Sequence, residues 1–113
     1  MNPGMYMLRW FGINREEHME LDLQRIKETD RKIKIQSPDA LEAMQCVDSW
    51  IFMGYSEWYR ENILKKIKLN IRFDVAWEHL GEVYCGRRKF YEFRKEYLKA
   101  VARELYLEKG SEI

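Results

Sequence analysis

The sequence predicts an all-α protein, a compact bundle of about five helices that ends in a helix-turn-helix. Its 113 residues include only two prolines and six glycines, and a sandwich of short β-strands needs more turn formers than that. Long stretches are instead rich in Lys, Glu, Arg and Leu, and their apolar residues recur at helical spacing. A chain of this length predicts one domain, over residues 1–113.

The N-terminal part, residues 1–54, is expected to supply supporting helices. It begins with an apolar piece, "MYMLRWFGI", that we expect to dock on the core. A charged helix is expected over residues 14–32, with Asn14 as its cap, because Asn readily accepts hydrogen bonds from the first free N–H groups. The alternation in "KIKIQ", residues 32–36, leaves a short extended piece open as an alternative.

The next helix has clear boundary signals. Ser37 is a favourable N-cap, and Pro38 follows at the first helical position, where its missing N–H costs nothing. Gly54 is expected to end this helix. One face of it is expected to be apolar, through Leu41, Met44, Val47, Ile51 and Phe52.

Residues 55–107 are expected to form the helix-turn-helix part. Ser56 caps the helix "EWYRENILKKIKL", whose inward side chains are expected to be Tyr59, Ile63, Leu64 and Ile67. Asn70 or Asp74 then opens a short helix, "VAWEHLG", which Gly81 closes. The last helix is expected from Arg87 to Leu107, with a buried stripe of Phe90, Phe93, Tyr97, Val101 and Leu105.

A short helix, a tight turn and a longer basic helix occur in the order of a helix-turn-helix. Gly81 is small enough for a steep crossing between two helices, and Tyr84 is expected to fill the turn. Trp50, Trp58 and Trp77 are expected to belong to the core.

Positive charge gathers in this C-terminal part. Residues 57–99 carry 11 basic and 7 acidic side chains, although the net charge of the whole chain is only +1. The start of the last helix is the part of such a motif that enters the major groove of DNA. Its candidate DNA-binding residues are Arg87, Arg88, Lys89, Tyr91, Arg94 and Lys95. On the preceding helix and its exit, the residues expected to hold the phosphate backbone are Lys65, Lys66, Lys68 and Arg72, and the three lysines are expected to point to solvent.

Two interpretations of this basic surface stay open. One is a small DNA-binding regulator whose partner is double-stranded DNA, either as a monomer or as a homodimer that reads paired half-sites. The other is a protein-interaction module, such as an inhibitor or adaptor of another protein, that uses the same surface against an acidic partner. A plain solvated helix face is the alternative to both.

Other classes of function lack signals. Cys46 and Cys85 form no CxxC pair, which favours a reducing cytoplasm over a disulfide framework. His79 lies six residues from Cys85 without further ligands near in sequence, so no metal site, cofactor or enzyme is expected. We expect no secretion signal and no membrane association, because no apolar run approaches the roughly 20 residues of a membrane span.

Residues 48–107 resemble the small phage late-operon transcription regulators of the ArpU/RinA type, whose C-terminal half is similar to the helix-turn-helix of sigma-factor region 4. The matching positions are Arg60, Ile63 and Leu64 in the first element, Trp77, Leu80 and Gly81 in the second, and Tyr91, Arg94, Leu98 and Ala102 in the third. Gly86 replaces the usual Ser before the recognition helix, and the turn is one residue shorter. The resemblance implies regulation of phage transcription, with RNA polymerase or another host protein as a further candidate partner. Under the alternative interpretation, the chain would be a phage-encoded inhibitor or adaptor of a host protein.

Overall fold

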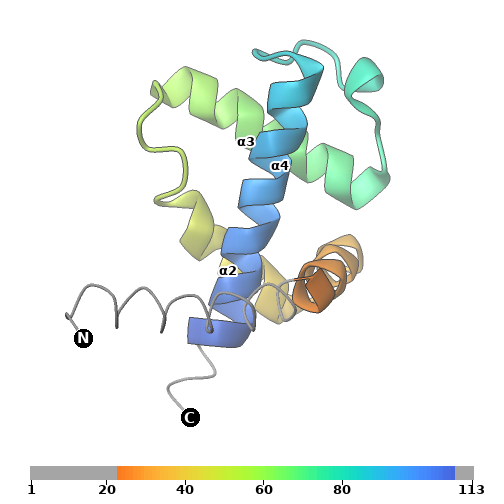
Figure 1. The fold of residues 1–113 in the computed structure, drawn as a ribbon, viewed down its shortest axis with the longest axis vertical. Helices are drawn as coiled ribbons and strands as arrows, with labels where there is room; N and C mark the ends of the chain where they lie inside the picture. Colours follow the sequence, from red (N-terminus) through yellow and green to blue (C-terminus); the bar gives the residue numbers. More distant parts are fainter. Residues whose placement is uncertain (1–22, 109–113) are drawn as a thin grey trace, which may run out of the picture.

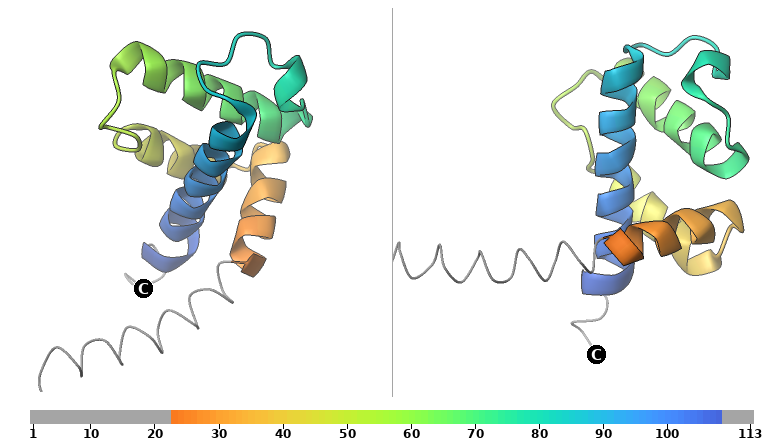
Figure 2. Two further views of the ribbon diagram at one scale, coloured as in Figure 1. Left: turned by 45° about the horizontal axis from the view of Figure 1, so that its top comes forward. Right: turned by 45° about the vertical axis from the view of Figure 1, so that its right-hand side comes forward.

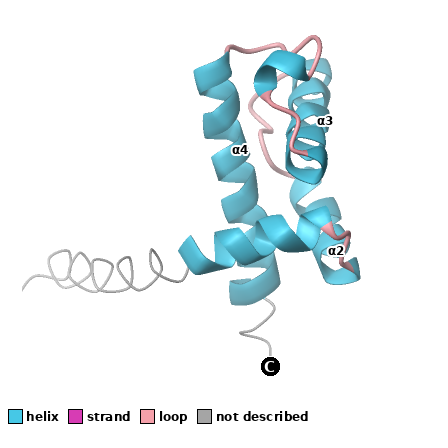
Figure 3. Cartoon of the chain, turned by 90° about the vertical axis from the view of Figure 1, so that its right-hand side faces the viewer, coloured by secondary structure: helices cyan, strands magenta, loops and turns pink. Residues whose placement is uncertain are grey.

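The computed structural model describes residues 23–108, and this part of the chain is helical without any strand (Figure 3). The all-α prediction is thereby confirmed for the described residues. They form four helices rather than about five, because the short helix expected before Gly81 is only a single 3₁₀ turn. The expected docking of residues 1–12 and the cap at Asn14 lie outside the described residues.

The first described helix covers residues 23–34 and ends in a left-handed turn. Gln36 has φ 56°, and this conformation directs the N–H of Gln36 to the Ile33 carbonyl and the N–H of Ser37 to the Lys32 carbonyl, at 3.1 and 3.0 Å. These two bonds satisfy the last carbonyl groups of the helix, as in a Schellman motif. The stretch "KIKIQ" therefore belongs to a helix end, and Ile33 is fully buried.

α2, Pro38–Asp48, starts where the sequence predicts and ends earlier. Ser37 is its N-cap, and Pro38 is its first residue. Beyond Asp48 the chain forms an irregular loop in which Phe52, rather than Gly54, has a positive φ of 61°. Ile51 is nevertheless buried, so the apolar stripe continues into the core after the helix has ended.

α3, Glu57–Phe73, is longer than predicted. Its inward positions Ile63, Leu64 and Ile67 are buried, in agreement with the prediction. Neither of the two residues expected to open the next helix does so, because Asn70 lies inside α3 and is buried, and the N-cap of the 3₁₀ turn that follows is Ala76 rather than Asp74. Asp74 ends α3 with φ 53°, a left-handed conformation that Asp tolerates better than most residues.

The connection between α3 and α4, residues 74–86, is fastened to α3 by side chains. Lys66 Nζ donates to the Leu80 carbonyl at 2.7 Å. Asn62 donates to the Glu82 carbonyl and accepts from the Tyr84 N–H, both at 3.0 Å. η1, Trp77–His79, is the 3₁₀ turn within this connection. Gly81 is exposed with φ +83°, so its role is to allow the left-handed turn rather than a close helix crossing.

α4, Arg87–Ala102, lies at the centre of the fold and continues into the π-helical segment η2, Arg103–Glu108. α3 crosses the N-terminal half of α4, while α2 and the helix over residues 23–34 lie near its C-terminal half (Figures 1 and 2). The predicted stripe is confirmed, since Phe90, Phe93, Tyr97 and Val101 are buried and Leu105 packs against the core.

A polar network joins the three labelled α-helices inside this packing. The hydroxyl of Tyr97, which is fully buried, donates to Asp48 Oδ1 at 2.9 Å, and Lys68 binds the other carboxylate oxygen of Asp48. Arg60 donates to the backbone carbonyl groups of Asp48 and Ile51. Burial raises the pKa of the Tyr97 phenol far above its ordinary value, and the neighbouring Asp48 adds to this effect, so the phenol stays a donor.

Candidate nucleic-acid interface

The first turn of α4 carries three consecutive cations, Arg87, Arg88 and Lys89, and no acidic residue. It stands at one end of the described structure, above its crossing with α3 (Figure 1). Gly86 is the N-cap and provides no side chain for the free N–H groups of this turn. A helix N-terminus favours negative charge, so the three cations are placed against the helix dipole. An anion at this end would satisfy both the N–H groups and the side chains.

The three cations are exposed and weakly paired. Arg88 has 95% of its side chain exposed, and its Nε lies 3.7 Å from Glu92. Arg87 lies 3.7 Å from Glu78, and Lys89 lies 3.9 Å from Glu92. Exposed pairs of this kind contribute only about 0 to 1 kcal/mol, so all three side chains remain available to a ligand.

Lys95 extends this surface along α4. It is exposed, lies two helical turns after Arg88 on the same side, and has no ion-pair partner among residues 23–108. Glu92 lies between the two residues, so the surface is not uniformly basic. We call Arg87, Arg88, Lys89 and Lys95 the basic start of α4.

Two predicted DNA-binding residues on α4 have inward contacts instead. The Tyr91 hydroxyl accepts a bond from the Trp77 N–H at 3.4 Å, and its ring packs against the core. Arg94 donates through Nε to Asn70 Oδ1 and contacts Asp30 at 3.3 Å, with only 25% of its side chain exposed. Arg94 therefore joins α4 to α3 and to the first described helix.

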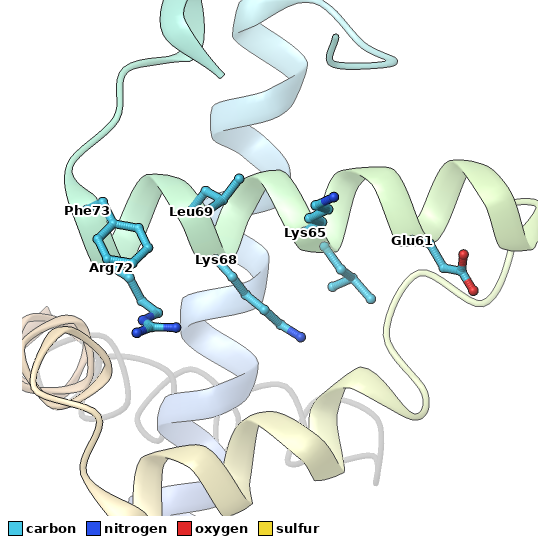
Figure 4. Close-up of a pocket in the computed structure, with 7 residues that line it drawn as sticks. Glu61, Lys65, Lys68, Leu69, Arg72 and Phe73 are labelled. Atoms are coloured by element: carbon cyan, nitrogen blue, oxygen red, sulfur yellow. The ribbon is translucent and has the colours of Figure 1, made fainter. Parts of the chain in front are cut away.

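The four predicted backbone-binding cations of α3 do not share one surface with the basic start of α4. Lys66 and Lys68 are bound to Leu80 and Asp48, as described above. Lys65 and Arg72 lie on the side of α3 that is turned away from α4. Figure 4 views α3 from this side, and α4 crosses behind it. The structure thus divides the ten predicted residues between the basic start of α4, the side of α3 turned away from α4, and half-buried positions with contacts to other parts of the chain.

Exposed aromatic rings are a feature that the sequence interpretation missed. Trp58 and Trp50 were expected in the core, but 64% and 51% of their surfaces are exposed. Trp58 packs edge-on against Tyr84, with ring centroids 5.0 Å apart. Tyr84, which was expected to fill the turn, is thus an exposed residue that packs with Trp58 on the surface. The helical spacing of Trp58 relative to Ile63 and Ile67, which places it on another side of α3, is the signal that indicates its exposure.

Cys85 directly precedes Gly86, the N-cap of α4. Burial raises the pKa of the Cys85 thiol, which keeps it protonated, although the Tyr59 hydroxyl beside it acts in the opposite direction. Within residues 23–108, no three His, Cys, Asp or Glu side chains come together as a metal site. No helix in the same range is long and apolar enough to cross a membrane.

Comparison with known proteins gives no match to this chain, whether to a family model, a curated protein or a solved structure.

Proposed function

We propose that this chain is a small sequence-specific DNA-binding protein that reads the major groove with the basic start of α4. The observation that carries the proposal is the first turn of α4, where three exposed cations are placed against the helix dipole without a carboxylate in the same turn. Phosphate groups of DNA would turn this unfavourable placement into a favourable one.

The dimensions of this surface suit a duplex. Arg88 and Lys95 are separated by two turns, or about 10 Å along the axis. The major groove is about 12 Å wide and admits one helix. In the proposed complex Arg88 pairs with a base edge or clamps a phosphate through its planar guanidinium, and Arg87, Lys89 and Lys95 bind phosphate groups.

The connection before α4 supports a helix-turn-helix role. Trp77 binds the Tyr91 hydroxyl through its backbone N–H and the Cys85 carbonyl through its indole N–H, both at 3.4 Å. These bonds hold the 3₁₀ turn against the start of α4. In this proposal the turn takes the place of the first helix of the motif, and α4 is the recognition helix.

The biological role follows from the resemblance to ArpU/RinA-type regulators. We propose that DNA binding serves transcription regulation, and that the gene is of phage origin. RNA polymerase or another host protein is a further proposed partner, and a homodimer would place two copies of α4 about one helical turn of DNA apart.

The test is a salt titration with a fluorescent random-sequence duplex. Four cations predict a plot of log affinity against log salt with a slope of about −3.6. Affinity should therefore fall about 100-fold between roughly 50 and 200 mM salt. A protein that does not bind duplex at about 50 mM salt contradicts the proposal and favours the alternative, an interaction module that offers this surface to an acidic protein.

A further inference from the structure

α3 has a second surface, on the side turned away from α4 (Figure 4). We call it the outer face of α3 and define it by Trp58, Lys65, Lys68, Leu69, Arg72 and Phe73. Large apolar groups stand near both of its ends, since Trp58 is 64% and Phe73 58% exposed. A shallow hollow of about 330 Å³ lies along this face, with Phe73 lining one end and Glu61, about one turn after Trp58, lining the other; Leu64 and Leu69 also line it.

The cations of this face are only partly satisfied by the described residues. Lys65 is exposed and has no ion-pair partner among them. The Arg72 guanidinium lies 4.8 Å above the Phe73 ring, and its Nε–H is enclosed without an acceptor in the described part of the chain. An enclosed donor without an acceptor costs free energy, but a ligand cannot reach it. The Arg72 side chain as a whole is only half-buried, and its terminal nitrogens, which are not enclosed in the same way, can donate to an incoming oxygen atom. Lys68 is partly neutralised by Asp48, and Glu61 is the one carboxylate of the hollow.

The spacing of the face indicates the shape of its ligand. Trp58, Lys65 and Arg72 follow one another at seven-residue intervals, the spacing that lets one helix lie along another. They span about 21 Å, or four turns of helix. We propose that the outer face of α3 binds an acidic amphipathic helix of a protein partner, with a partner carboxylate on Arg72 and partner leucines over Trp58 and Phe73.

Charge complementarity favours this occupant over DNA. A duplex offers phosphates for Lys65 and Arg72, but it offers little to the exposed Trp58 and Phe73 near the ends of the outer face of α3. A helix with carboxylates and leucines on one side satisfies both kinds of group. This inference does not rest on the proposed DNA binding, which uses the basic start of α4.

The experiment uses the full chain, labelled with ¹⁵N, and a capped helical peptide of about four turns composed of Leu, Glu and Ala. The Arg72 Nε–H and the Trp58 indole N–H each give a resolvable signal. Both signals are expected to shift and saturate with this peptide. A matched peptide with Gln in place of Glu should bind about tenfold more weakly, because the charge-assisted bond to Arg72 is lost.

Two variants separate this surface from the basic start of α4. Lys65→Gln, which alters an exposed side chain, should weaken peptide binding about fivefold without changing the fold, and Lys95→Gln should leave it unchanged. Arg72→Gln should weaken peptide binding more than Lys65→Gln does, and circular dichroism checks that this variant is folded. The inference is overturned if neither signal shifts at millimolar peptide, if the Gln peptide binds equally well, or if duplex DNA shifts the two signals and the peptide does not.

Discussion

Arg94 offers the sharpest separation between a structural and a DNA-binding role. Its guanidinium connects α4 to Asn70 on α3, 24 residues away in sequence, and to Asp30 on the first described helix, 64 residues away. The decisive change is Arg94→Met, which keeps the apolar stem and removes both contacts. Arg94→Lys is the matched variant, because it keeps the charge and loses the planar fork.

The expected cost follows from the two contacts. The bond to Asn70 is charge-assisted and partly buried, and bonds of this kind contribute about 1.5 to 3 kcal/mol. The contact to Asp30 adds at most about 1 kcal/mol, because Lys34 remains 2.9 Å from that carboxylate. Arg94→Met should therefore lower the free energy of unfolding by about 1.5 to 4 kcal/mol, which corresponds to about 6 to 17 °C in Tm. Arg94→Lys should lie between this variant and the wild type.

Thermal and urea unfolding, followed by circular dichroism and by tryptophan fluorescence, measure this loss. Arg88→Gln is the control, because its side chain is 95% exposed and should change stability by less than about 0.5 kcal/mol. If Arg94→Met unfolds like the wild type while DNA affinity falls as much as in Arg88→Gln, Arg94 belongs to the ligand surface and the structural assignment is refuted.

Three further changes test the fold. Tyr97→Phe removes the buried hydroxyl bond to α2 and should cost about 1 kcal/mol in urea unfolding; an unchanged midpoint would count against the network. Gly81→Ala should lower the free energy of unfolding by about 1 kcal/mol, because Gly81 has φ +83°, a left-handed conformation that is unfavourable for Ala. A variant more stable than the wild type would contradict the left-handed turn at this position. Bonds from Ser37 and then Lys32 lower the pKa of Asp39 from 3.8 to about 2. The stability that this carboxylate contributes is present above pH 4 and is lost as the pH falls toward 2. Asp39→Asn should remove this contribution, so its Tm should fall less than the wild-type Tm between pH 4 and pH 2. Equal falls in Tm for the variant and the wild type would contradict the prediction.

Local sequence signals correctly predicted the start of α2 and the buried side of α4. Ser37 with Pro38 placed the start of α2, and the apolar spacing from Phe90 to Val101 identified the buried side of α4. These features are local, since capping and helical periodicity depend on neighbours within a few residues. The basic start of α4 was visible for the same reason.

The misplaced residues depend on contacts between distant segments. Asn70 has the polarity of a helix cap, yet it lies inside α3 because Arg94 and the Val75 carbonyl satisfy its amide. Trp58 is apolar enough for a core, but its position on α3 turns it outward. Such pairings join residues far apart in sequence, and neither composition nor spacing specifies which of them form.

The salt dependence of DNA binding by Arg88→Gln tests the central claim most directly. Arg88 is expected to meet DNA and little else, so the variant should fold normally. Its slope of log affinity against log salt should be shallower by about 0.9 if the lost contact is a phosphate. Lys27→Gln, which alters an exposed lysine on the first described helix, should keep the wild-type slope. Equal affinities and equal slopes for Arg88→Gln and Lys27→Gln would contradict the assignment of the basic start of α4 to DNA.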